Sequence, residues 1–341
     1  MIYGEPLRHP SAWRGEAMRG DSSWIARLSP AMCEEIDQAL RAVEARGLDA
    51  AEFAAEDFPL PRTGDFLRRC RDEVERGRGF VLIRGLPAEQ YDLARLRRIY
   101  WGIGTHLGVA VYQTGGAEIL DISDKGQDVR QLGVKPHDTN AEQRPHSDPA
   151  DLVALLCVRK AHSGGTSHIA SSMAIYNEIL ATRPDQLACL RRGFRCDLRG
   201  DGGGPGVTPD PIPVFSEIEG VLSCVFNAST IKDAQRRTGE IVPAEEMAAV
   251  DHMVELARRD DIRLDMDFEP GDIQLLNNFT ILHWRGAFTD HAEAERRRLL
   301  LRLWFSRPTA RPVAPVMRSG YITGAEKGQP IPVRRRLRQA G

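Results

Sequence analysis

Two short segments, far apart in the chain, carry residues that could bind one metal ion together. The first contains His146 and Asp148, separated by one residue, and the second contains His283. In an extended segment, residues two apart point to the same side, so an imidazole and a carboxylate would converge there. Two histidines and one carboxylate form a ligand set that holds Fe(II) and leaves coordination positions open. The three residues therefore predict a mononuclear non-haem iron site.

Neither segment is specific when taken alone. A His-x-Asp motif is short, and a polar loop can contain one by chance. His283 ends the largely apolar stretch 272–282, and a histidine in that position is often a satisfied core residue. The iron interpretation depends on the combination of the two segments, and a zinc hydrolase with the same ligands and a bound water is an alternative.

A strand with two arginines follows the second histidine. Its alternation places apolar side chains on one face and two arginines on the other: Leu299, Leu301, Leu303 and Phe305 against Arg298, Leu300, Arg302 and Trp304. The arginines lie either in water or in an interior pocket, where a buried charge requires an anionic partner. A guanidinium matches a carboxylate at two points. The distal carboxylate of 2-oxoglutarate, whose keto-acid end chelates iron, is such a partner, whereas a zinc hydrolase leaves Arg298 without a role.

The elements that must position these residues change in character along the chain. The first hundred residues predict helices at 30–47, 64–77 and 88–104 and one strand at 79–83. Later segments predict helices at 171–182 and 243–259, a hairpin at 214–226, and strands at 118–122, 152–158, 263–268, 272–277 and 298–305. Strands of this number with irregular loops indicate a β-sandwich or jelly roll carrying helices. We expect a single domain over 1–341, with a mainly helical part at 1–75.

Composition excludes several classes of protein. The chain has 341 residues and a formal net charge of −2, so nothing indicates nucleic-acid or anionic-membrane binding. Its six cysteines form no Cys-x-x-Cys pair, which is typical of a reduced, cytosolic protein. No apolar run resembles a signal peptide or is long enough to span a bilayer. We therefore expect a cytoplasmic protein that acts on a small molecule.

The chain resembles the TauD/TfdA family of Fe(II)/2-oxoglutarate-dependent dioxygenases, within the clavaminate-synthase-like superfamily. The resemblance rests on segments that occur in the same order between residues 75 and 310, namely 79–85, 146–148, 164–167, 270–273, 277–283 and 298–304. It implies an α+β fold with a double-stranded β-helix (jelly-roll) core and flanking helices. One such segment would be weak evidence, whereas several in order are specific.

The resemblance also implies roles for individual residues. It makes His146, Asp148 and His283 the iron ligands, and it places Arg298 on the distal carboxylate of 2-oxoglutarate. A hydroxyl group accompanies that arginine in relatives, and either Ser167 or Thr166 could supply it here. Arg302 matches a position that holds an anionic group of the substrate in some relatives, and Gln113 belongs to a segment that often lines this pocket. Arg144, which shares the strand phase of His146, and Asn140 are further candidates for substrate contact from their place before His146. For Gln113, Arg144 and Asn140 a purely structural role is an equal alternative.

Several assignments stay open at this stage. Arg298 lies further beyond His283 than in the taurine dioxygenase pattern, so Arg297 competes with it, although strand phase puts Arg297 with the leucines. Arg285 is interpreted as a salt-bridge partner. Four histidines without a ligand pattern are interpreted as structural or exposed: His106, His137, His162 and His168.

The reaction implied by the resemblance couples oxidation of a substrate to decarboxylation of 2-oxoglutarate. Succinate and CO2 are released, and an unactivated C–H bond of a small anionic or amino-acid-like molecule is hydroxylated with O2. Asp148 argues against halogenation, because related halogenases have a small residue at that position. Desaturation, cyclisation and a non-catalytic sensor of metal and 2-oxoglutarate are alternatives. The Gly- and Pro-rich segment 197–213 is a candidate lid, and a homodimer is possible.

Overall fold

A seven-stranded sheet forms the centre of the molecule. The computed structural model describes residues 4–128, 130–131, 134–198, 206–307, 309–318 and 327–334. Within these, the strand order is β1-β2-β11-β5-β14-β3, with β4 also paired to β14. The strands are β1 (Ile25–Arg27), β2 (Phe80–Arg84), β3 (Val109–Val111), β4 (Leu120–Ile122), β5 (Leu152–Arg159), β11 (Ile273–Asn277) and β14 (Leu299–Ser306). Strand β5, which is largely buried, lies in the middle between β11 and β14.

A smaller antiparallel sheet packs against the first. Its order is β10-β7-β12, with β7 (Ser167–Ser171) between β10 (Arg263–Met266) and β12 (Ile281–Arg285). One hydrophobic cluster joins the two sheets, because it contains Leu276, Leu300 and Trp304 of the large sheet with Ile169 and Ile281 of the small one. Two minor pairs complete the strands: β6 (Ser163–Gly164) with β13 (Phe288–Thr289), and β8 (Phe215–Ile218) with β9 (Val221–Cys224). Two facing sheets with irregular connections form the predicted jelly-roll core.

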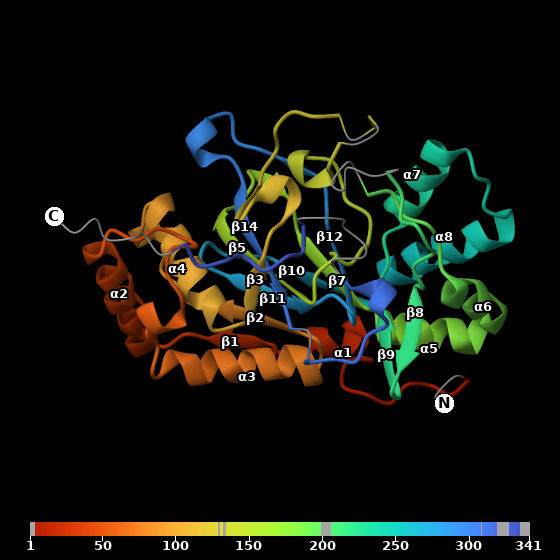
Figure 1. The fold of residues 1–341 in the computed structure, drawn as a ribbon, viewed down its shortest axis with the longest axis horizontal. Coiled ribbons are helices and arrows are strands. Elements are labelled where there is room, and N and C mark those ends of the chain that lie inside the picture. Colours follow the sequence, from red (N-terminus) through yellow and green to blue (C-terminus); the bar gives the residue numbers. More distant parts are fainter. Residues whose placement is uncertain are drawn as a thin grey trace.

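Helices cover this core in two groups (Figure 1). The N-terminal helices α2 (Pro30–Ala45), α3 (Thr63–Arg76) and α4 (Leu93–Thr105) pack on the outer face of the large sheet. The second group, beyond the small sheet, contains α5 (Ser172–Thr182), α6 (Pro184–Arg192), α7 (Ala228–Thr238) and α8 (Ala244–Arg258). The short α1 (Gly15–Arg19) lies against β10. Single 3-10 turns occupy Ala55–Asp57, Ala88–Gln90, Thr114–Gly116, Pro136–Asp138, Ala294–Arg296 and Pro315–Met317.

Strand β14 shows why this sequence forms this core. Its four apolar residues at alternate positions join the cluster under the N-terminal helices: Leu299, Leu301, Leu303 and Phe305. Leu300 and Trp304 point the other way, into the space between the two sheets. The period-two alternation therefore separates a helix-covered face from an interior face, and it directs the intervening arginines inward.

Most of the predicted elements are present within a few residues, but three helical features differ. The predicted helix at 171–182 is followed at once by a helix that was not predicted, α6, which Pro184 opens because proline fits the first position of a helix. Helix α7 was not predicted: its buried face is formed by Ala228, Ile231 and Ala234, and only one of these three is a large apolar residue. The predicted helix at 88–104 begins later, at Leu93, where the side chain of Asp92 accepts the Arg95 amide hydrogen.

Three further predictions concern membrane helices, the cysteines and the candidate lid. No helix in the described ranges combines the length and apolar character needed to cross a membrane. All six cysteines are free thiols. The predicted lid at 197–213 includes residues 199–205, which lie outside the described residues.

Candidate metal centre and substrate cavity

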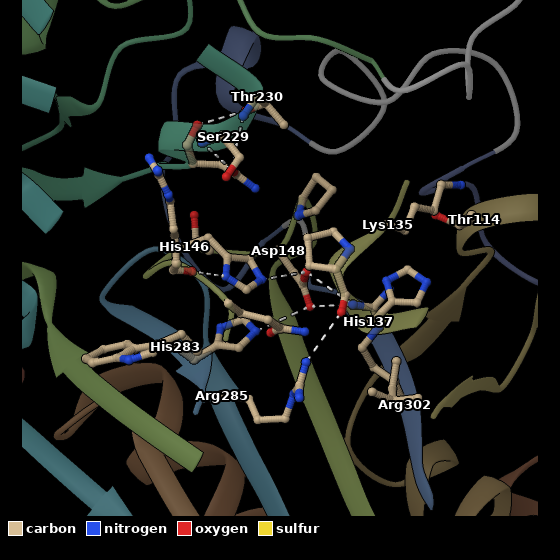
Figure 2. A pocket seen from close by; sticks show the side chains of 18 of the residues that line it. Thr114, Lys135, His137, His146, Asp148, Ser229, Thr230, His283, Arg285 and Arg302 are labelled. Carbon is tan, nitrogen blue, oxygen red and sulfur yellow. Dashed lines mark hydrogen bonds and ion pairs between the residues drawn. The ribbon is translucent and has the colours of Figure 1, made fainter. Parts of the chain in front are cut away.

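The two histidines and the aspartate predicted to bind iron converge at one point (Figure 2). Nε2 of His146 lies 3.9 Å from Oδ1 of Asp148, and Nε2 of His283 lies 3.7 Å from Oδ2 of the same carboxylate. The ligand atoms of the three residues all lie within 4.8 Å of one another. In the described part of the chain, this is the one group of three or more His, Cys, Asp or Glu side chains with such spacing.

Backbone pairing holds the three ligands in register. His283 lies in the middle of β12, and His146 exchanges two backbone hydrogen bonds with it, at 3.1 and 2.8 Å. His146 also forms a bridge with Asn227, the N-cap of α7. The backbone N–H of Asp148 donates to Oδ1 of Asn278 at 3.0 Å. The His-x-Asp segment is therefore extended, as predicted, and is fixed on both sides.

The protonation of the triad fits a divalent metal ion. Nδ1 of His146 lies 2.9 Å from the carbonyl oxygen of Arg144, which can only accept, so Nδ1 carries the proton and Nε2 has the free lone pair. Burial, together with the neighbouring His146, lowers the pKa of His283 to about 3, so its ring is neutral at physiological pH. Burial opposes the charge of Asp148, but Arg302 and the two histidines hold its pKa below the ordinary value. Two neutral imidazoles and one carboxylate match the donor set of an Fe(II) site.

Arg298 lines the same cavity without an acidic partner among the described residues. It is 5% exposed, and its guanidinium lies 5.2 Å from the centre of the Phe288 ring. Asp290 accepts a hydrogen bond from the Arg298 backbone N–H rather than from the side chain. Burial lowers the pKa of Arg298 to about 10, which leaves it charged at neutral pH. A buried guanidinium of this kind is a site for an anion.

The two candidate hydroxyl residues occupy different places. Ser167 is buried and lines the cavity, and its Oγ lies 3.1 Å from Nε2 of Gln274. Thr166 donates its hydroxyl to Oδ1 of Asp267 at 3.2 Å and is absent from the cavity lining. Arg297 points to the surface, where it donates to the carbonyls of His291 and Ala292.

Arg302 also faces the cavity, but it already has protein partners. Its Nη1 lies 3.3 and 3.2 Å from the two oxygens of Asp148, and its Nε donates to Oε1 of Gln113 at 2.8 Å. Gln113 is buried behind Arg302 and outside the cavity lining. Arg144 lines the cavity, is exposed, and has no side-chain partner among the described residues, whereas Asn140 is exposed and does not line the cavity.

Two cavity residues have roles that the sequence did not indicate. Arg285 has no carboxylate partner within the described ranges; its Nη2 instead donates to the backbone carbonyls of Thr139 and Ala141, at 3.0 and 2.8 Å. His137, expected to be structural or exposed, lines the cavity, and burial followed by Arg302 lowers its pKa to about 2. In the sequence, the position of His137 in the cavity was indicated only by the polar stretch that leads directly to His146.

Positive charge dominates the cavity lining. The lining contains six lysines and arginines, namely Lys135, Arg144, Arg285, Arg298, Arg302 and Lys327, and two aspartates, Asp148 and Asp197. Asp197 forms an ion pair with Arg237, which lies outside the lining. Ser229 and Thr230, at the start of α7, add hydroxyl groups to the lining, and in Figure 2 they lie above the triad, away from Lys135 and Thr114. Such a cavity favours anionic ligands.

Comparisons with known proteins give one family match and several similar proteins. Residues 44–304 match the model of the "Taurine catabolism dioxygenase TauD, TfdA family". The chain is 32% identical over 311 residues to FR-33289 synthase from Streptomyces rubellomurinus, covering 89% of this chain and 91% of that protein. It is 29% identical over 312 residues to the taurine hydroxylase-like protein SAT17 from Stachybotrys chartarum, covering 87% and 79%.

Solved structures show the same fold at low sequence identity. Asparagine oxygenase in complex with Fe(II), 2S,3S-3-hydroxyasparagine and succinate has a TM-score of 0.67 at 15% identity, covering 89% of this chain and 99% of that one. The non-haem iron oxygenase OrfP in complex with Fe and alpha-ketoglutaric acid has a TM-score of 0.60 at 14% identity, covering 84% and 97%.

Proposed function

The chain belongs to the TauD/TfdA family of Fe(II)/2-oxoglutarate-dependent dioxygenases, and we propose that it hydroxylates an unactivated C–H bond of a small anionic or amino-acid-like molecule. The reaction consumes O2 and 2-oxoglutarate and releases succinate and CO2. One observation carries the proposal: the His-Asp-His triad shares a cavity with a buried arginine that has no acidic partner in the described protein. A sensor would also need the triad, but the wide, charged cavity provides room for a further ligand.

We assign the metal to His146, Asp148 and His283. Their neutral imidazoles and ionised carboxylate supply three protein ligands, and Fe(II) bound there supplies the activation of O2. The protein holds these ligands on β12 and on the extended segment that pairs with it, so the site is built on backbone hydrogen bonds rather than on a flexible loop.

We assign the distal carboxylate of 2-oxoglutarate to Arg298. Its position beside β14, its burial and its lack of an acidic partner support a two-point contact with a carboxylate. Ser167 is the better candidate for the accompanying hydroxyl, since it lines the cavity and Thr166 does not.

The remaining positive charge supports an anionic substrate. After 2-oxoglutarate is placed on Arg298, Arg144, Lys135 and Lys327 still line the cavity. Arg144 is the proposed anion contact with the clearest support, since it has no side-chain partner in the described protein. Arg302 and Asn140 remain predictions as substrate contacts, and Gln113 would act through Arg302. The named ligands of the similar structures, 3-hydroxyasparagine and hydroxylated arginines, support an amino-acid-like molecule.

Location and assembly are also proposals. Six free thiols support a reducing compartment such as the cytoplasm. A homodimer and the division into one domain with a mainly helical N-terminal part stay predictions from the sequence. Desaturation or cyclisation would use the same site and would differ from hydroxylation only in the product.

An anaerobic titration tests the metal and cosubstrate assignments. We expect Fe(II) with 2-oxoglutarate to give a visible charge-transfer band, and we expect His146→Ala to lose it. A panel of amino acids, other carboxylates, sulfonates and phosphonates, scored by substrate-dependent succinate release, then tests the anionic class. If the wild-type protein shows no charge-transfer band, the proposed function is wrong. If only cationic or neutral compounds stimulate succinate release, the proposed anionic class of substrate is wrong.

A further inference from the structure

Two residues of β14 contact the carboxylate of Asp148. Nε1 of Trp304 donates to Oδ2 at 2.9 Å, and Nη1 of Arg302 lies 3.2 Å from Oδ2 and 3.3 Å from Oδ1. Oδ2 therefore has one short, directed hydrogen bond and a charge-assisted contact, whereas Oδ1 has only the longer contact with Arg302. The two carboxylate oxygens are not equivalent.

Arg302 is itself locked in place. Gln113 accepts from its Nε at 2.8 Å, and Nε2 of Gln113 donates back to the Arg302 carbonyl at 2.8 Å and to the Glu118 carbonyl at 3.2 Å. The guanidinium carbon of Arg302 lies 4.4 Å from the centre of the Trp304 ring. Asp148, Arg302, Trp304 and Gln113 are all buried. The side chains form one connected network in which each polar group restricts the next.

We propose that Trp304 and Arg302 are positioning residues for the metal ligand Asp148, and that Gln113 acts through Arg302. They engage Oδ2, which also lies 3.7 Å from Nε2 of His283, and leave Oδ1, 3.9 Å from Nε2 of His146, as the oxygen without a short hydrogen bond and therefore the one available to the metal. An aspartate restricted to one oxygen takes a single coordination position. The positions needed by 2-oxoglutarate and O2 then stay open, because a carboxylate free to rotate could bind through both oxygens. The inference rests on the proposed function, since it needs a metal at the triad.

The network also explains why Arg302 differs from the anion contact expected at its position. Two of its three nitrogens are engaged with Asp148 and Gln113, so a substrate anion would share this arginine with a metal ligand. Partners of metal ligands of this kind typically change metal affinity by about 10- to 100-fold when they are removed. Metal binding can therefore be measured without knowing the substrate.

The test is a titration with Co(II) alone, followed by its visible spectrum and by competition with a chelator. We expect Trp304→Phe and Arg302→Lys each to weaken Co(II) binding by about tenfold or more. We also expect an altered ligand-field spectrum, because the released carboxylate can change its binding mode. Gln113→Leu should also weaken Co(II) binding, but by a smaller factor, since Gln113 acts only through Arg302.

Trp101→Phe is the matched control. Trp101 is also buried and also donates its Nε1, at 2.9 Å to the carbonyl of Phe53, but it lies among the N-terminal helices. We expect it to lower stability without changing the Co(II) spectrum or affinity. If Trp304→Phe and Gln113→Leu keep both the wild-type affinity within twofold and the wild-type spectrum, the inference is wrong while the proposed function stands. Failure of the wild-type protein to bind Co(II) or Fe(II) would instead overturn the proposed function, and the inference with it.

Discussion

Arg298 and Arg302 lie four residues apart beside the same cavity, yet they have opposite surroundings. Both are buried and both line the cavity. Arg302 forms an ion pair with Asp148 and a hydrogen bond with Gln113. Arg298 lies beside the face of Phe288 and forms no ion pair in the described protein, and the charge of Asp290 acts on it without direct contact to its guanidinium. One charge is balanced within the protein, and the other is left for a ligand.

This difference shows how a ligand site can be recognised before any ligand is known. A buried charge with protein partners stabilises the fold or orients its neighbours, whereas a buried charge without them has an energetic cost that a ligand can offset. Removing the two arginines should therefore have opposite effects on stability and different effects on binding. The two positions can be compared directly, because they have the same residue type, lie four residues apart and line the same cavity.

Replacing Arg302 should have the largest effect. Arg302→Met leaves Asp148 buried with an unbalanced charge, and we expect the metal-free protein to lose about 3–5 kcal/mol of unfolding free energy. Urea unfolding of the metal-free protein measures this loss. Adding Asp148→Asn should recover a large part of it, because the uncompensated charge is then removed. A loss below about 1 kcal/mol would mean that the ion pair is effectively solvent-screened.

Replacing Arg298 should mainly affect the cosubstrate. Arg298→Met removes the partner of the distal carboxylate, and we expect 2-oxoglutarate affinity to fall by about 2–5 kcal/mol, with metal affinity unchanged. The Fe(II) charge-transfer band, titrated with 2-oxoglutarate, measures the affinity. Arg297→Met is the control, since that neighbouring guanidinium donates to surface carbonyls. Equal losses in the two variants would reject the assignment of Arg298.

The same Arg298 variant should behave unlike the Arg302 variant in the absence of ligands. Methionine replaces a buried, unpaired charge, so we expect the metal-free protein to be as stable as wild type or more stable by about 1 kcal/mol. Urea unfolding under the conditions used for Arg302→Met gives the direct comparison. A clear loss of stability would show that Arg298 has a structural role in the empty protein.

Local patterns were sufficient to predict much of the fold. Strand β14 alternates strictly, so its sequence alone indicates which side chains pack under the helices and which face the interior. Ser29 precedes the apolar period of α2, and its side chain accepts the Met32 amide hydrogen as an N-cap. The convergence of His146, Asp148 and His283 was predictable because their residue types together suit one kind of metal site, even though His146 and His283 are far apart in the chain.

The interaction partners of the cavity side chains could not be predicted, because they come from distant parts of the chain. The strand phase shows that Arg302 points inward, but not that Asp148, 154 residues earlier, is already there. Arg285 was expected to meet a carboxylate, and it instead meets backbone carbonyls of the 136–141 segment, which no side-chain pattern encodes. His137 lies in that same irregular segment, so neither helical nor strand periodicity indicated that it faces the cavity.

The pH dependence of stability tests whether His137 is enclosed beside Arg302. Burial, followed by Arg302, lowers its pKa to about 2, so the folded protein keeps it neutral at pH values where the unfolded chain, with an ordinary pKa near 6.5, binds a proton. Stability from this group is therefore complete above pH 6.5 and falls as the pH decreases. Between pH 7.5 and 5.5 we expect His137 to contribute a loss of about 1 kcal/mol of unfolding free energy, in addition to that from other groups.

Urea unfolding of the metal-free protein at both pH values tests this contribution. The loss of unfolding free energy between the two pH values should be smaller by this amount in His137→Gln than in wild type. Equal losses in the two proteins would place His137 in water rather than in the cavity wall.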